Sequence, residues 1–159
     1  MAAPFRLDAF VGRGETRLIV GFFDLTLYTK WCERTPAEDV LAFATDFFAL
    51  AGREIARLGG TLVKPIGDAG LFVFPPDHPA KVRDGLDAMR AELDGWLVER
   101  GYPGTLAIKL GLGPVAVGRV GAPGDERLDV YGGTVNDVAL LEGAPFAESP
   151  RLKAALEAT

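Results

Sequence analysis

A hairpin pattern stands between two long amphipathic helix patterns, and this order limits the folds that the chain can adopt. Residues 61–74, TLVKPIGDAGLFVF, are two apolar runs joined by Gly67-Asp68, a pair with good turn chemistry. Apolar residues recur at three- and four-residue steps over 35–58 before the hairpin and over about 79–99 after it. Each helix pattern therefore predicts one apolar face that must pack on a sheet.

Strand patterns flank these elements. Residues 17–25, RLIVGFFDL, form a short continuous apolar run that is typical of a buried strand. Residues 105–112 alternate apolar and other side chains, 114–121 indicate another strand, and a polar loop follows over 122–127. The order β-α-β-β-α-β predicts an α+β, ferredoxin-like fold, in which two helices cover one face of an antiparallel sheet.

The first long helix carries start and stop signals. Thr35 and Glu38 have the spacing of a capping box, with Pro36 at the first helical position. Gly59-Gly60 follows the last apolar position and predicts the end of the helix.

Length and composition predict a single domain over residues 1–159. Its core would span about 17–142, and Ser149-Pro150 would begin a short C-terminal helix over 149–158. The net charge of −5 argues against nucleic-acid binding, which normally needs a basic face.

Cysteine and hydropathy patterns bear on the compartment. A single cysteine excludes an internal disulfide and favours a reduced, cytoplasmic setting. The longest apolar run near the N-terminus, residues 18–23, is far shorter than the roughly 20 residues that a membrane span needs, so we expect a soluble chain with no membrane segment. The only histidine, His78, lies in a polar turn and is interpreted as a surface residue.

Two aspartates are candidates for a metal site. Asp24 ends the first buried strand and Asp68 lies at the hairpin tip, and in a βαββ unit these two points can meet. Two close carboxylates repel each other unless a proton or a cation intervenes, and Mg²⁺ is the usual cation, generally with phosphates. The competing interpretation of Asp68 is a simple turn-forming residue.

Three further polar residues occur among apolar ones. Lys64 lies in a hairpin strand, Asp129 in a later strand, and Asn136 at a helix start. Each also has an ordinary interpretation, respectively a solvent-facing lysine, an edge-strand charge and a helix-start residue. No GxxxxGK[ST] phosphate loop occurs in the sequence.

Taken together, three segments resemble the catalytic domain of class III adenylate/guanylate cyclases. These segments are LIVGFFDLTLYTKWCER, with its Asp before a Tyr-Thr; ARLGGTLVKPIGDAGLFVF, with its Gly-Gly, Lys and Gly-Asp; and GPVAVGRVGAPGDERLDVYGGTVNDVALLE, with its Gly-Pro-Val and Gly-x-Thr-Val-Asn. Each motif is weak alone, but they occur in the family's order and cover roughly residues 17–142.

The resemblance implies a role for each candidate. Asp24 and Asp68 match the family's aspartates for two Mg²⁺ or Mn²⁺ ions per site, Lys64 and Asp129 match its adenine-reading pair, and Asn136 matches the catalytic residue that orients the ribose. The implied reaction is two-metal, in-line attack of the ribose 3′-hydroxyl on the α-phosphate of ATP, giving cyclic AMP and pyrophosphate. In the family, the site lies between two subunits, so the resemblance implies a homodimer.

The sequence also departs from the family. Leu140 stands where an arginine normally meets charge on the α-phosphate, and Leu27 replaces a glycine near the triphosphate. The chain is about two residues short around Leu112-Gly113, and Lys153 is in the wrong context to replace the family's second phosphate-binding lysine.

Two functions follow. One is an adenylate cyclase of low activity. The other is a non-catalytic cyclase-homology module that dimerises, binds nucleotide and regulates a partner. A diguanylate-cyclase-like palm shares the fold plan, but the hairpin lacks a Gly-Gly-Asp/Glu-Glu-Phe signature.

Overall fold

A computed structural model describes residues 4–158 of the chain. Its helices are a 3-10 turn η1 (Leu7–Phe10), α1 (Tyr28–Glu33), α2 (Ala37–Arg57), α3 (Pro79–Glu99), α4 (Gly133–Ala139) and α5 (Pro150–Glu157). Its strands are β1 (Glu15–Leu25), β2 (Thr61–Ile66), β3 (Ala69–Phe74), β4 (Leu106–Val120), β5 (Arg127–Tyr131) and β6 (Phe146–Glu148).

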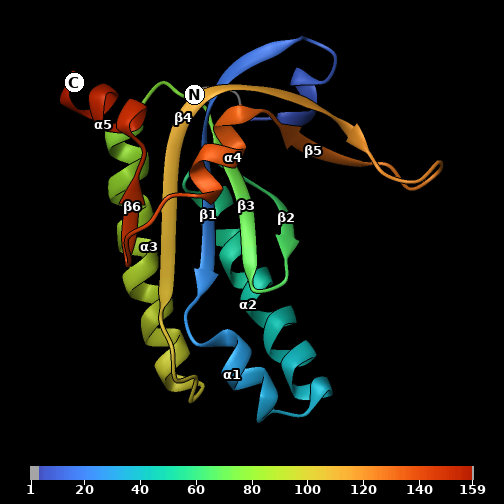
Figure 1. Ribbon diagram of the computed structural model, residues 1–159, viewed down its shortest axis with the longest axis vertical. Coiled ribbons are helices and arrows are strands. Elements are labelled where there is room, and N and C mark those ends of the chain that lie inside the picture. Colours follow the sequence, from blue (N-terminus) through green and yellow to red (C-terminus); the bar gives the residue numbers. More distant parts are fainter. Residues whose placement is uncertain (1–3, 159) are drawn as a thin grey trace.

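The strands form one sheet with the order β2-β3-β1-β4-β5 (Figure 1). Neighbours along this order are antiparallel, and β6 adds to β4 in parallel. The first four strands have the order of the ferredoxin-like plan, so the predicted fold class is confirmed. Central β1 pairs with both β3 and β4, which places Asp24 at the end of the middle strand.

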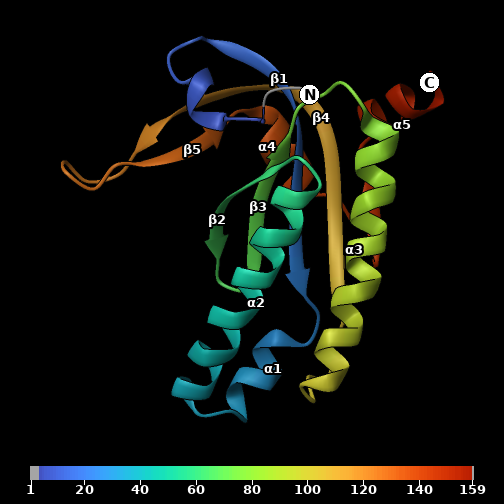
Figure 2. The same cartoon turned by 180° about the vertical axis from the view of Figure 1, so that it is seen from behind.

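Helices α2 and α3 cover one face of the sheet (Figure 2). Their apolar stripes pack on the side chains that β1 and β3 direct to that face, among them Phe23 and Phe72. Gly59 ends α2 with a positive φ of 98°, and the amides of Gly59 and Gly60 bond back to the carbonyls of Ala56 and Ile55. This is the double hydrogen-bond pattern of a glycine-terminated helix, as predicted.

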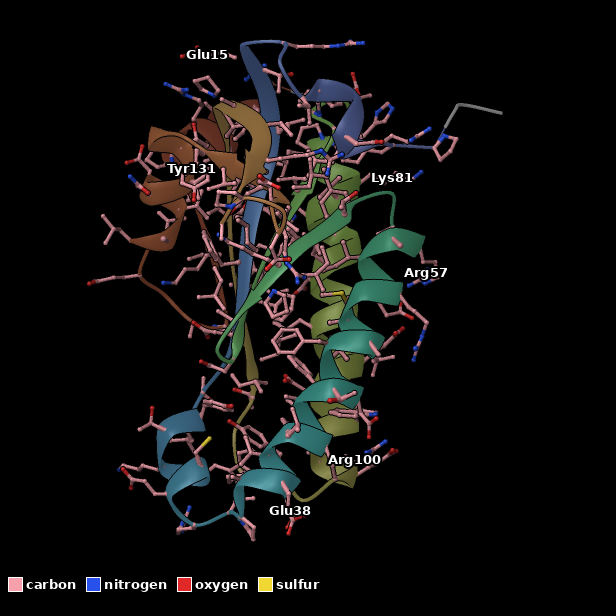
Figure 3. All side chains as sticks on the ribbon, turned by 90° about the vertical axis from the view of Figure 1, so that its right-hand side faces the viewer. Glu15, Glu38, Arg57, Lys81, Arg100 and Tyr131 are labelled. Carbon is pink, nitrogen blue, oxygen red and sulfur yellow. The ribbon has the colours of Figure 1, made fainter. Side chains whose placement is uncertain are left out.

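The opposite face is only partly covered. A second apolar cluster lies there, beneath α4 and η1, and includes Leu7, Val20, Val73, Val117 and Val138. The view along the sheet shows the helix layer, with Arg57 and Arg100, on one side, and Tyr131 on the other (Figure 3). In Figure 1 no helix lies in front of the lower half of β1 and β3. Asp24 is the next-to-last residue of β1.

Two local predictions need correction. The Thr35–Glu38 capping box is wrong, since α2 begins without a side-chain cap and the Thr35 hydroxyl donates instead to the Trp31 carbonyl at 2.6 Å. The two strands predicted over 105–112 and 114–121 are one 15-residue strand, β4, that runs through Pro114. Because β4 changes partners along its length, Pro114 does not interrupt it.

Three short elements were not predicted. The 3-10 turn η1 precedes β1, helix α1 follows the end of β1, and β6 pairs with the first half of β4. The predicted C-terminal helix is present as α5, and the Ser149 side chain caps it by accepting from the Leu152 amide at 3.2 Å.

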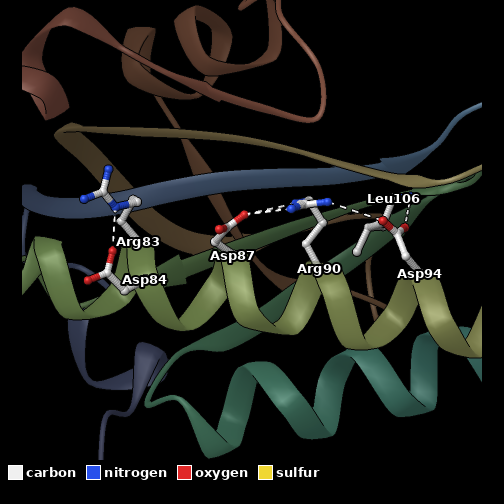
Figure 4. Close-up of polar contacts among 6 residues, drawn as sticks. All are labelled: Arg83, Asp84, Asp87, Arg90, Asp94 and Leu106. Carbon is white, nitrogen blue, oxygen red and sulfur yellow. Dashed lines mark hydrogen bonds and ion pairs between the residues drawn. The ribbon is translucent and has the colours of Figure 1, made fainter.

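Charged side chains along α3 fix the start of β4 (Figure 4). Arg90 pairs with Asp87 at 3.0 Å and with Asp94 at 3.3 Å. Asp94 also accepts a hydrogen bond from the Leu106 amide at 2.8 Å. Leu106, the first residue of β4 after the turn that follows α3, is therefore hydrogen-bonded to α3 itself.

Among residues 4–158, none of the helices combines the length and the apolar content that crossing a bilayer requires.

Candidate functional site

The strand end and the hairpin tip meet, as the sequence predicted. Asp68 accepts a hydrogen bond from the Leu25 amide at 3.1 Å, so its carboxylate lies against the residue next to Asp24. Both aspartates are half-buried. Phe23 and Leu25 point into the helix-side core, so the alternation along β1 directs Asp24 to the open face.

The two carboxylates interact electrostatically. Burial, and then the negative charge of Asp68, raise the pKa of Asp24, and the nearby Lys109 ammonium acts in the opposite direction. Lys109 pairs with Phe22 across β1 and β4, which places it on the same open face as Asp24. This end of the sheet is thus short of positive charge.

These donors fit a hard divalent cation. Mg²⁺ is usually held by one or two carboxylates together with phosphates and water, rather than by a cage made only of protein. Two converging aspartates match that donor set, while the part of the chain that the structure describes holds no group of three or more His, Cys, Asp or Glu arranged for a metal. The roles of Asp24 and Asp68 as metal ligands remain a prediction.

Lys64 and Asp129 form an ion pair with Nζ and Oδ2 2.6 Å apart. The Asp129 side chain is only 9% exposed, so it is not an ordinary surface charge, whereas the Lys64 side chain stays 40% exposed. Asp129 Oδ1 also accepts from the Val130 amide at 2.8 Å, and the Lys64 ammonium lies 5.8 Å from the centre of the Tyr131 ring. These contacts hold the pair in place.

The ion pair joins the two edge strands of the sheet. Lys64 belongs to β2 and Asp129 to β5, which lie at opposite ends of the strand order yet touch each other. A pocket of about 380 Å³ opens beside the pair, lined also by Val63, Pro65, Val120, Arg127 and Leu128. Its volume falls in the range of small-molecule sites, roughly 300–1,000 Å³.

The remaining predicted residues lie elsewhere. Asn136 is exposed on α4, and its side chain forms no hydrogen bond with residues 4–158. Leu140 follows α4 and is 79% exposed, while Leu27 follows β1 and is 53% exposed. Asp24, Asp68 and Asn136 do not line the 380 Å³ pocket beside the Lys64–Asp129 pair.

Sequence reasoning missed two neighbours of the aspartates. Lys109 was visible as a charge in the alternating strand 105–112, but only the β1–β4 register places it beside Asp24. The Tyr102 hydroxyl donates to the Thr26 carbonyl at 2.6 Å, and no local pattern connects residues so far apart.

Comparisons with known proteins concern the chain as a whole and its fold. No family model matches the chain. A protein from Anabaena cylindrica named adenylate cyclase is 30% identical over 142 residues, which is 84% of this chain and 28% of that protein. The chain thus spans less than a third of this curated relative.

Solved structures share the fold. The adenylyl cyclase CyaB from P. aeruginosa superposes with a TM-score of 0.81 at 20% identity, covering 91% of this chain and 82% of that one. The guanylate cyclase domain of RhGC from Catenaria anguillulae, solved with GTP, superposes with a TM-score of 0.80 at 24% identity, covering 90% and 84%.

Proposed function

Because this chain is a homologue of the class III adenylate and guanylate cyclase catalytic domains, we propose that it converts ATP to cyclic AMP and pyrophosphate at a site shared by two copies of the domain. The observation that carries the proposal is the pairing of the candidates: Asp24 with Asp68, and Lys64 with Asp129. The Asp24–Asp68 pair is two acidic groups that a cation would stabilise. The Lys64–Asp129 pair offers a hydrogen-bond donor and an acceptor beside a pocket.

Asp24 and Asp68 would hold the metal end of the nucleotide. Two Mg²⁺ or Mn²⁺ ions, when bound, supply charge that stabilises the attacking and leaving oxygens of an in-line displacement. The chain holds the two carboxylates together by the Leu25–Asp68 hydrogen bond. Lys109, on the same face, adds a positive charge that suits the triphosphate.

Lys64 and Asp129 would select adenine. An ammonium donates to the ring nitrogen of adenine, and a carboxylate accepts from its exocyclic amine. Guanine presents the opposite pattern at those atoms and would leave both side chains mispaired, at a cost of about 1–3 kcal/mol. Asn136, exposed with a free side-chain amide, would orient the ribose.

A homodimer would unite the two pairs. The Asp24–Asp68 pair of one copy would face the Lys64–Asp129 pair and Asn136 of the other, and a two-fold axis would form two such sites. Exposed apolar residues stand near these groups, among them Ile66 beside the hairpin tip, Tyr131 at the end of β5 and Leu140 after α4. A reaction that uses ATP, in a chain with a single cysteine, is expected in the cytoplasm.

A second function is favoured by the side chains at positions 140 and 27. Leu140 offers no donor to an α-phosphate, and Leu27 projects a side chain near the strand end that carries Asp24. A domain with these residues can retain dimerisation and nucleotide binding without turnover, and would then act as a regulatory cyclase-homology module.

The deciding experiment measures cyclic AMP formed from ATP with Mg²⁺ or Mn²⁺, beside the binding of an uncleavable ATP analogue. Formation of product that is lost in Asp24→Ala but kept in the matched control Asp77→Ala supports the cyclase. Binding with no product at any protein concentration supports the regulatory module. Absence of both binding and product contradicts both functions.

A further inference from the structure

We propose that the Tyr102 hydroxyl is a positioning group that holds residues 25–27 in place and keeps Leu27 in a left-handed backbone conformation. The inference deepens the proposed function and rests on it, because residues 25–27 directly follow Asp24. Tyr102 lies in the turn between α3 and β4, 76 residues away in the sequence.

Residues of the turn form several hydrogen bonds with Thr26. The Tyr102 hydroxyl donates to the Thr26 carbonyl at 2.6 Å, and the Thr105 amide donates to the Thr26 hydroxyl at 2.8 Å. The Thr26 amide in turn donates to the Thr105 carbonyl at 2.9 Å. A side chain at Gly104 would collide with the Thr26 carbonyl oxygen, so the turn fits closely against this residue.

The next residue resists the conformation that it adopts. Leu27 has φ 63° and ψ 15°, and it is the only non-glycine residue with a positive φ among residues 4–158. A branched, bulky residue is strained in this region, whereas glycine adopts it freely. Leu27 therefore needs support from its surroundings, and the Tyr102–Thr26 hydrogen bond is the adjacent contact that supplies it.

Tyr102 is itself firmly held. It is 5% exposed, its ring stacks on Phe43 with centroids 5.3 Å apart, and Trp31 meets it edge-on at 5.2 Å. The Asp94–Leu106 hydrogen bond fixes the other end of the turn (Figure 4). Burial raises the pKa of Tyr102, so its hydroxyl stays protonated and remains a donor at neutral pH.

The segment matters because both aspartates depend on it. Asp24 immediately precedes residues 25–27, and Asp68 accepts its hydrogen bond from the Leu25 amide. A shift of this backbone moves one carboxylate and releases the other. Misplacement by about 1 Å can lower a rate by roughly 10²-fold.

A double-mutant cycle tests the inference, with Tyr102→Phe, Leu27→Gly and the combined variant. Tyr102→Phe removes only an oxygen and keeps the packed ring. The first measurement is amide hydrogen exchange without nucleotide at Thr26 and Trp31, whose amides bond to the Thr105 and Leu27 carbonyls. We expect Tyr102→Phe to speed this exchange by about five- to tenfold. Leu27→Gly should reverse most of that change, since glycine keeps the left-handed conformation unaided.

Two controls separate the causes. Leu27→Ala removes the bulk but keeps a Cβ, so it should not reverse the exchange if backbone strain is the cause. Tyr131→Phe removes a hydroxyl from an exposed tyrosine and should leave exchange at these two amides unchanged.

The second measurement is the Mn²⁺ dependence of nucleotide binding and turnover. Tyr102→Phe should raise the Mn²⁺ concentration for half-maximal effect and lower kcat by about tenfold or more, and Leu27→Gly should restore both. Unchanged exchange in Tyr102→Phe overturns the inference, whatever the activity. Faster exchange with unchanged Mn²⁺ dependence also overturns it, because the hydroxyl would then be only structural. If the wild-type domain forms no product, the proposed cyclase activity fails, while exchange and Mn²⁺-nucleotide binding still decide the role of Tyr102.

Discussion

The two residue pairs of the candidate site differ in how their charges are balanced. Burial, and then the like charge of Asp68, raise the pKa of Asp24, and the Lys109 ammonium acts in the opposite direction. Lys64 and Asp129 are opposite charges 2.6 Å apart, and the aspartate is nearly buried. The metal end therefore lacks a charge that the ligand must bring, whereas the base end is already satisfied.

This difference predicts two modes of recognition. At the metal end, a ligand adds cations and relieves repulsion, so binding there should stabilise the fold. At the base end, a purine must share donors and acceptors that already serve each other, so the net gain is small and the effect is on the choice of base. The predictions below test this contrast, from the largest expected effect to the smallest.

Removal of an aspartate should have the largest effect. We expect Asp24→Ala to lower cyclic AMP formation by about 10³-fold or more, because both ions would lose a ligand. It should also abolish the thermal stabilisation by Mn²⁺ with nucleotide. The control Asp77→Ala removes an exposed aspartate outside the site. Retained activity in Asp24→Ala would show that Asp24 does not hold a metal ion that the reaction needs.

Restoring the missing donor should raise activity. Leu140→Arg places a guanidinium after α4, and we expect turnover to rise by up to about 10²-fold if that donor is the main defect. Leu140→Gln is the matched control, since it adds a polar side chain without charge. An equal gain in both variants would show that charge is not the reason, and no gain would point to Leu27.

Reversing the charge at the base end should change selectivity more than rate. In Lys64→Glu two carboxylates face each other, and the preference for ATP over GTP, measured as a ratio of kcat/KM, should fall by roughly 10- to 100-fold. Lys81→Glu reverses a charge on α3, outside the site, and should leave the ratio unchanged. An unchanged ratio in Lys64→Glu would refute the adenine assignment.

The smallest effect concerns the metal-free fold. Because the pKa of Asp24 is raised in the folded state, the folded chain holds this proton more tightly than the unfolded chain. Its contribution to stability is therefore complete below the ordinary value of 3.8 and is lost as the pH rises through the raised value. Burial is the largest cause of the raised pKa of Asp24, the negative charge of Asp68 adds to it, and the Lys109 ammonium opposes it.

Asp24→Asn should accordingly melt slightly higher than the wild type at pH 7 without metal, by less than about 3 °C. The difference should shrink as the pH falls through the raised pKa of Asp24 and should vanish below the ordinary value of 3.8, where the carboxyl is protonated in both the folded and the unfolded chain. A lower melting temperature for Asp24→Asn at pH 7 would mean that repulsion at this end is negligible.

Sequence patterns predicted the helices with repeated apolar positions and the turns set by neighbouring residues. The long apolar stripe of α3 predicted Pro79–Glu99 within a residue, because a stripe over several turns leaves little freedom in its bounds. Gly67-Asp68 predicted the hairpin tip, since few residue pairs suit so tight a bend. These signals need no knowledge of distant partners.

What the sequence did not predict depends on tertiary contacts. Thr35 has the spacing of a cap, but the unpredicted helix α1 offers its hydroxyl the Trp31 carbonyl instead. The Lys64–Asp129 and Tyr102–Thr26 contacts join residues more than 60 positions apart. The strand-end and hairpin-tip positions suggested a metal site at Asp24 and Asp68, whereas the roles of Lys64, Asp129 and Asn136 came from family motifs, and all of these roles remain predictions.

The edge strand β2 has a consequence for how copies of this domain can meet. Its register shifts between Leu62 and Lys64, and Pro65 brings no amide hydrogen to that edge. Edges with bulges and prolines are poor templates for strand addition, the route by which open sheets often aggregate. Association at this edge should therefore proceed through side chains and stay reversible, without extending the sheet into a fibre.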